Sequence, residues 1–311
     1  GFYNAVKNAP FLPAQGLENL KSISDEVRFL DPGQILNLPG LEKNSVKVYV
    51  LGPPRNKAML FDKDPKNSET YDHKLAMAGT LAENFLSALT NFSDMKGDLE
   101  EEQFPFNRKF KRKFKLNSTL SSTYLDPKKE WRKIDEEWLE QAERLALYLD
   151  AYTNNSSLVL AFELVASRKV LLFVGDAQTG NWLSWNEISW EKVSPQFRTS
   201  DLLANTVLYK VGHHCSHNAT LVECLEKMEH QELVAMVPVD RTDPHIKKEK
   251  GWKMPATNLY KRLKELSKNR VLLMDSGWDP ECDPDGAARG SWEKLSQPKI
   301  YDLFVEYEVH G

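Results

Sequence analysis

The chain has 311 residues, a formal net charge of −4 and a pI near 6.1, and 41% of its residues are hydrophobic. This length and apolar fraction allow one large domain or two ordinary ones with a sizeable core. The charge excludes a global attraction to nucleic acid or anionic membranes, and no apolar run reaches the ~18 to 20 residues of a membrane span. The N-terminus lacks a signal-peptide pattern. Three cysteines without CxxC spacing predict reduced thiols and a cytoplasmic protein.

The first predicted element is a strand over residues 46–51, where apolar residues alternate with others. Gly52, Pro53 and Pro54 follow it and form a firm break in regular structure. We therefore assign residues 1–55 to a first segment that carries the first core strand.

Residues 56–150 have a different character, which predicts a largely helical insertion or arm. A helix is expected over 71–92, and an amphipathic helix over 131–150 has apolar residues spaced three to four apart. Between them lie an acidic run at 98–102 and a basic run at 108–115.

The basic run places Phe106, Phe110 and Phe114 four residues apart, on one helical face. This spacing favours an amphipathic segment that docks on the core. Binding of nucleic acid or phosphate is the weaker alternative for the same run.

From residue 151 to 311 the pattern alternates between strands and helices, which indicates an α/β fold. Strands are expected over 157–165, 169–175, 206–211, 233–239, 270–275 and 300–309, and helices around 182–190, 218–229 and 255–268. Ser167 and Arg168 are a connection short enough for a hairpin, so the sheet is predicted to be mixed.

Two of these strands end on residues that can bind a metal. The strand from Val170 ends on Gly175 and Asp176, and the strand from Val207 ends on His213 and His214. Neighbouring strands would deliver the carboxylate and the imidazoles to one rim, where this donor set suits Zn²⁺, Mn²⁺ or Fe²⁺. Two or three ligands are too few for a catalytic site.

The order of these motifs resembles the second half of the metallo-β-lactamase-fold hydrolases. The matching motifs are the Gly-Pro-ended strand at 48–54, the Asn-Asn-Ser-Ser segment at 154–157, the Gly-Asp strand end and the Val-Gly-His-His loop at 211–214. The branch that includes the hydrolase domain of bacterial DNA-uptake channel proteins is the most similar.

The resemblance implies a role for each matching residue. Asp176 would bridge two metal ions, one of His213 and His214 would be the last histidine ligand, and the other would support it. Gly175 would let the backbone approach the metal closely. Polar residues would orient the surrounding loops or contact the site: Asn154, Asn155, Ser157, Ser216 and Asn218.

Two departures from the family pattern are important. The His-x-His-x-Asp-His loop, which supplies most of that family's ligands, is missing, and His73 is the only histidine before position 213. The chain is therefore interpreted as the C-terminal half of an αββα sandwich. Cys215 also stands where the family usually has Gly, a change that is tolerable if its φ angle is negative.

This interpretation predicts a hydrolase that holds two metal ions when full-length, with a phosphodiester favoured over a lactam, thioester or lactone. This chain alone is expected to be inert, with a weak or empty metal site. Its expected partners are the missing N-terminal half or another copy of itself, since half a sandwich exposes an apolar face. The competing interpretation is a non-catalytic binding or regulatory module that retains the fold.

Structural explanations compete for the same residues. Asp176 could cap a turn, the histidine pair could be satisfied internally, and Asn218 could be the N-cap of the 218–229 helix. The loop with Asp240, Asp243 and His245 could approach the rim or be ordinary turn chemistry. Tryptophans could line a pocket but are usually core residues: Trp182, Trp185, Trp190, Trp252 and Trp278.

Overall fold

A computed structural model describes most of the chain in two units, residues 1–31 and 32–311. The described residues are 13–24, 26–62, 65–66, 68–71, 154–191, 193–247, 253–275, 277–301 and 304–311. Within the first unit the helix α1 spans Pro13–Ser22. The helices expected at 71–92 and 131–150, both charged runs, His73 and Trp252 lie outside the described residues, apart from Tyr71.

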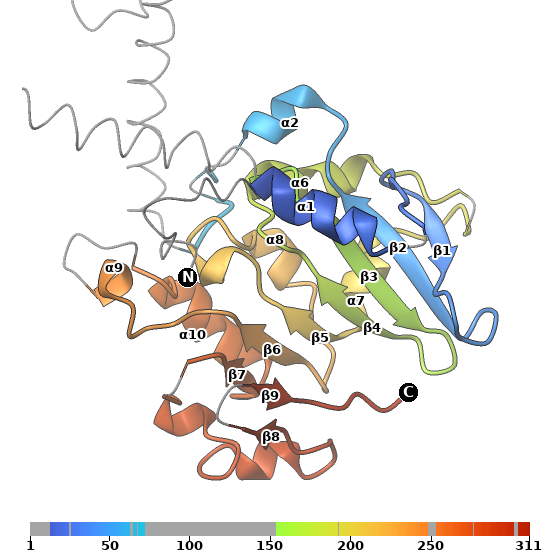
Figure 1. Ribbon diagram of the computed structural model, residues 1–311. Helices are drawn as coiled ribbons and strands as arrows, with labels where there is room; N and C mark the ends of the chain where they lie inside the picture. Colours follow the sequence, from blue (N-terminus) through green and yellow to red (C-terminus); the bar gives the residue numbers. More distant parts are fainter. Residues whose placement is uncertain are drawn as a thin grey trace, which may run out of the picture. The chain divides into compact units, whose positions relative to one another are not determined.

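The second unit is built on a seven-stranded mixed sheet whose strands follow one another in chain order (Figure 1). The three pairings from β1 to β4 are antiparallel, and the three from β4 to β7 are parallel. The α/β class and the mixed sheet are thus confirmed. The strands are β1 (Ile35–Asn37), β2 (Val46–Gly52), β3 (Val159–Leu164), β4 (Lys169–Phe173), β5 (Thr206–Lys210), β6 (Val234–Val237) and β7 (Val271–Leu273).

The insertion lies between two strands that pair directly. β2 and β3 are antiparallel neighbours, with Val46 opposite Leu164 and Val50 opposite Leu160. The short helix α2 (Lys57–Phe61) follows β2, and β3 and β4 form the hairpin expected at Ser167 and Arg168. The chain therefore leaves the sheet after β2 and returns to the adjacent position.

Helices pack against one face of the sheet. These are α6 (Thr179–Ser184), η4 (Trp185–Glu187), α7 (Thr199–Ala204), α8 (Val222–Leu225) and α10 (Thr257–Leu266). Strand residues such as Ala161, Leu172 and Tyr209 meet Trp182 and Leu263 in this core. Trp182, Trp185 and Trp190 are buried, so these three are core residues.

The opposite face is covered over β5 to β7 by the C-terminal part of the chain. Trp292 and Ala288 pack there on Leu208, Val234 and Leu272. This part contains η6 (Pro280–Cys282), η7 (Arg289–Trp292), β8 (Lys299–Ile300) and β9 (Val305–Glu306). Among the described residues no helix combines the length and apolarity needed to cross a bilayer.

Two predicted elements are wrong in extent. The helix expected at 218–229 is reduced to the four residues of α8, because the side chains of Ser216 and Asn218 hydrogen-bond within the preceding loop instead of starting a helix. The strand expected at 300–309 is two short antiparallel strands, β8 and β9, and the Tyr301 amide donates to the Phe304 carbonyl oxygen. The strand β1 and the helix α7 have no counterpart among the predicted elements.

The contact between α2 and α6 requires a glycine at position 180. A Cβ atom there would lie 1.8 Å from the carbonyl oxygen of Met59, whereas one at Gly290 would meet nothing within 4 Å. We expect Gly180→Ala to lower the free energy of unfolding by about 3 kcal/mol or more, because α2 must move away. Gly290→Ala should change it by less than about 0.5 kcal/mol. Urea denaturation of both variants checks this, and equal stabilities would contradict the tight packing.

Candidate active site at the carboxyl ends of the parallel strands

The ends of β4 and β5 bring Asp176 and His213 to the same edge of the sheet. Phe173 and Lys210 are register partners in this parallel pair, and the two residues follow three positions later on each strand. A Cβ atom at Gly212 would lie 2.9 Å from the carbonyl oxygen of Gly175, so the two backbones are in contact just before these side chains. Ligand sites of open α/β sheets commonly lie at this edge.

Asp176 is held by its backbone and presents its side chain to solvent. Gly175 has a φ of +58°, which ends the strand, and the Asp176 amide donates to the Ser157 hydroxyl over 3.0 Å. The described residues offer no hydrogen-bond donor to the Asp176 carboxylate. Burial lowers the pKa of Lys210, and the charge of Asp176 acts against that shift.

His213 lies half-buried inside a ring of polar side chains. Its Nδ1 is 2.7 Å from the Ser216 hydroxyl and 3.1 Å from Asn218 Oδ1, and its Nε2 is 3.3 Å from Asn154 Nδ2. Gln178 places its amide nitrogen 3.3 Å from Nδ1. Burial lowers the pKa of His213, whereas the hydrogen bond to Asn218 and the charge of Asp176 raise it.

His214 faces the other way and is exposed. Its Nδ1 is 2.7 Å from the Pro238 carbonyl oxygen, so Nδ1 must carry the proton that it donates. In the neutral ring Nε2 then keeps a lone pair, and no described residue hydrogen-bonds to it. This is the tautomer that a histidine needs to bind a metal through Nε2.

The histidines belong to a left-handed turn, η5 (His213–Cys215). The φ angles of His213, His214 and Cys215 are +40°, +51° and +58°. The condition of a negative φ at Cys215 is therefore not met, and a residue with a Cβ adopts the conformation that glycine prefers. Left-handed helical geometry costs L-residues roughly 1 to 2 kcal/mol each, so the surrounding contacts must compensate.

Asn155 connects the segments around this edge. Its side-chain nitrogen donates to the carbonyl oxygens of Met59, Leu60 and Asp62, at 2.7 to 3.3 Å. Its side-chain oxygen accepts from the backbone amides of Gln178 and Asn181, each at 3.1 Å. The fully buried Asn155 thus joins the end of α2 to the start of α6. The helix α6 begins three residues after Asp176.

Both flanks of residues 72–153 contact the histidine loop. Thr70 donates from its hydroxyl to the His217 carbonyl oxygen over 2.9 Å, and Asn154 contacts His213 as described. Tyr71 hydrogen-bonds to Glu226, which also pairs with Arg262 at 2.6 Å. The insertion therefore leaves and rejoins the fold beside the candidate site.

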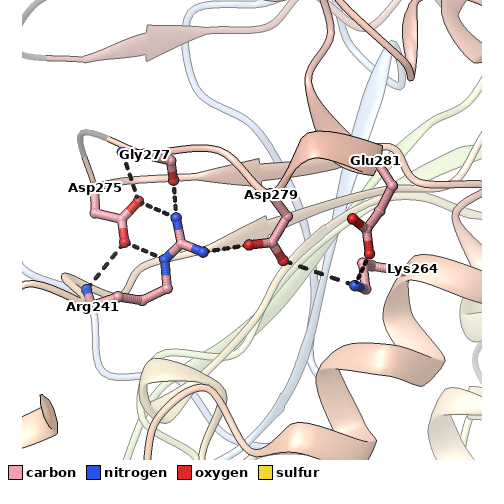
Figure 2. Close-up of polar contacts among 6 residues, drawn as sticks. All are labelled: Arg241, Lys264, Asp275, Gly277, Asp279 and Glu281. Atoms are coloured by element: carbon pink, nitrogen blue, oxygen red, sulfur yellow. Dashed lines mark hydrogen bonds and ion pairs between the residues drawn. The ribbon is translucent and has the colours of Figure 1, made fainter.

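A second polar cluster fixes the loops that follow β6 and β7 (Figure 2). Arg241 binds both carboxylate oxygens of Asp275, at 2.6 and 3.1 Å, and reaches Asp279 and the Gly277 carbonyl oxygen. Lys264 pairs with Glu281 at 2.5 Å. The Arg241 guanidinium is directed at partners within the protein, so we assign it a structural role.

The structure tests the alternative explanations for the polar loop residues Asn218 and Asp240. Asn218 is not a helix N-cap, because that position of α8 belongs to Leu221. Asp240 accepts from the backbone and hydroxyl of Thr242, which is turn chemistry. The side chain of His245 lies outside the described residues.

Sequence reasoning missed Gln178 and the Pro238 carbonyl group. Gln178 is 1% exposed, and its amide oxygen has no hydrogen-bond partner within the described residues. The only available signal was a polar residue two positions after Asp176. Pro238 contributes a backbone oxygen, which no side-chain motif reveals.

The side chains at this edge of the sheet supply only part of the ligands that a metal site needs. The tautomer of His214 and the unpartnered Asp176 carboxylate are suitable for Zn²⁺. Among the described residues, however, no group of three or more His, Cys, Asp or Glu side chains gathers to hold an ion. We therefore derive no reaction step through a metal.

Comparison of the chain with protein-family models, with curated proteins and with solved structures gave no match. The assignment of function consequently rests on the residues and their geometry.

The Arg241 cluster yields a stability prediction. The Asp275 side chain is 2% exposed, so Arg241→Met would leave a buried carboxylate without its cation. We expect a loss of about 3 kcal/mol in the free energy of unfolding. Arg262→Met, whose partners Glu226 and Glu265 are more exposed, should cost about 1 kcal/mol or less. Denaturant titration compares the two variants, and a similar loss in both would refute the buried pairing.

Proposed function

We propose that the chain is the C-terminal part of a metal-dependent hydrolase of the metallo-β-lactamase fold. The observation that carries the proposal is the edge formed by β4 and β5. An exposed carboxylate without a hydrogen-bond partner, Asp176, and an outward imidazole nitrogen of His214 follow adjacent parallel strands there. The remaining ligands would come from outside the described residues.

The proposed fold is half of an αββα sandwich. Helices cover one face of the sheet, and among the described residues the opposite face of β3 and β4 carries apolar side chains that are only partly covered. Leu160, Phe162, Leu171 and Phe173 share that face on β3 and β4, and Phe173 is 38% exposed. A second sheet packed there would remove these side chains from water.

A phosphodiester is the proposed substrate, on the ground of the resemblance alone. The edge offers no residue that would select a particular leaving group. All three cysteines are buried thiols, which agrees with the proposed cytoplasmic location.

A non-catalytic binding or regulatory module is the second candidate. The observation that favours it is the missing group of three ligands among the described residues. In such a module the polar ring around His213 would serve only to shape the loop.

Metal titration of the 311-residue chain tests the first candidate. Four-ligand zinc sites gain roughly 10 to 16 kcal/mol, so two ligands should hold Zn²⁺ only in the micromolar range or weaker. Asp176→Asn should weaken this binding at least tenfold, because it removes the anionic ligand. Asp285→Asn, another exposed carboxylate, is the control. The measurement is isothermal titration calorimetry together with elemental analysis.

Two tightly bound metal ions per chain would show that this chain alone completes the site, contrary to the fragment interpretation. Zn²⁺ binding that Asp176→Asn leaves unchanged would favour the non-catalytic module.

The accessible sheet face predicts self-association of the isolated chain. Phe173→Lys places a charge on this face and should shift the chain toward monomers in light scattering. Val193→Lys is a matched control, since Val193 is 37% exposed and outside the sheet. A wild-type chain that is monomeric at about 100 μM would contradict the exposed-face interpretation.

A further inference from the structure

We propose that Lys210 is the cation that binds an oxyanion of the substrate at the edge formed by the ends of β4 and β5. The contact between its ammonium group and an oxyanion rests on the position and surroundings of Lys210. The choice of a phosphodiester as that oxyanion rests on the proposed function.

Lys210 is the last residue of β5, which lies beside β4 in the sheet (Figure 1). Tyr209 and Val211 on either side of it are buried in the core under the helices, and side chains alternate along a strand, so Lys210 lies on the opposite face. Phe173 is its register partner on β4 and shares that face. The Lys210 side chain therefore extends from the carboxyl end of β5 beside the exposed side chain of Phe173.

The ammonium group of Lys210 has no ion pair or hydrogen bond within the described residues. Lys210 is half-buried, and burial lowers its pKa because the charged form loses contact with water. Lys169, which is also half-buried, pairs with Glu232 at 2.7 Å, and Lys264 pairs with Glu281 at 2.5 Å. A partly buried cation without a partner is costly, and charges of this kind gather at functional sites. We infer that a ligand supplies the missing counter-ion.

Asp176 acts on Lys210 through its charge but does not pair with it. That charge raises the pKa of Lys210, against the effect of burial, whereas the Asp176 carboxylate itself is exposed to water. The three N–H donors of the ammonium group therefore have no acceptor among the described residues. At this edge the carboxylate can bind a cation and the ammonium group an anion. In the proposed hydrolase the cation would be the metal ion, which would also offset the repulsion between Asp176 and an oxyanion.

A structural role for Lys210 is the competing explanation. Its aliphatic stem would cover Phe173 and Met236 on the neighbouring strands while the ammonium group reaches solvent. Methionine would serve this role as well as lysine does, whereas oxyanion binding requires the positive charge. The two explanations thus predict different properties for Lys210→Met.

Binding of dimethyl phosphate, a small phosphodiester anion, to the 311-residue chain tests the proposal. Trimethyl phosphate is neutral and similar in size, so it is the matched control ligand. Nuclear magnetic resonance follows the Cε signals of ¹³C-labelled lysines, and the signal of Lys210 is assigned from its loss in Lys210→Arg. Dimethyl phosphate should shift this signal with a Kd of roughly 10 mM, because one charge-assisted contact is weak. Trimethyl phosphate should leave it unchanged.

The variants are compared through the amide signal of Gly212. Lys210→Met should weaken dimethyl phosphate binding about tenfold, whereas Lys210→Arg keeps the charge and should stay within about twofold of wild type. Asp176→Asn should strengthen binding by about twofold, because it removes a negative charge near the ligand. Lys43→Met is the control and should match wild type. Lys43 is exposed and precedes β2, which runs in the same direction as β4, so it lies at the opposite edge of the sheet.

The proposal would be overturned if both esters shifted the Lys210 signal equally, if neither shifted it, or if Lys210→Met bound dimethyl phosphate as tightly as wild type. The Zn²⁺ titration decides the proposed function separately. Dimethyl phosphate binding through Lys210 without Zn²⁺ binding would keep the oxyanion contact and remove the metallohydrolase. Zn²⁺ binding that depends on Asp176, with no response of Lys210 to dimethyl phosphate, would have the reverse meaning.

Discussion

The architecture around the candidate site depends on one buried side chain, the carboxamide of Asn155. A carboxamide has two donor hydrogens and an acceptor oxygen, and all of them are used by backbone groups at the end of α2 and the start of α6. The end of α2 supplies carbonyl groups and the start of α6 supplies amides. Without Asn155 the buried amide of Gln178 would lose its hydrogen-bond acceptor, at a cost of about 1 to 3 kcal/mol, whereas Asp62 and Asn181 would keep their backbone bonds to Gly180 and Gln178. The hydrogen bonds of Asn155 therefore fix where α6 begins, and they also fix the backbone that follows Asp176.

Close contacts between backbone segments also hold the elements around the candidate site together. Gly175 and Gly212 bring the ends of β4 and β5 into contact, and Gly180 lets α6 touch the backbone of α2. A Cβ atom at Gly180 or Gly212 would lie less than 3.0 Å from its neighbours, so shape restricts these two positions to glycine, whereas Gly175 is favoured by its φ of +58°. The strain that remains is concentrated in the turn at His213 to Cys215, where polar contacts from Ser216 and Asn154 surround it. Strain held by satisfied polar groups is typical of functional sites.

The elements that could be predicted from the sequence are those specified by residues close together along the chain. The apolar runs that end at Asp176 and at His213 specify two neighbouring strands, and their parallel pairing follows from the α/β alternation. The length of α8 was not predictable in this way, because Ser216 and Asn218 turn toward His213 only after the loop has folded. Arg241 and Asp275 are 34 positions apart, and their pairing requires the β6–β7 register. Distant polar partners of this kind leave no periodic trace in a sequence.

The insertion lies between two strands that pair directly with each other, and its ends lie beside the candidate site. β2 and β3 pair across residues 72–153, and the cost of closing a longer loop grows only slowly with its length. Thr70 and Asn154 on the two flanks hydrogen-bond to the histidine loop, so the described residues bring both ends of the insertion to this loop. Its length can therefore change without disturbing the sheet register. A change at either flank, in contrast, acts directly on the turn that carries His213 and His214.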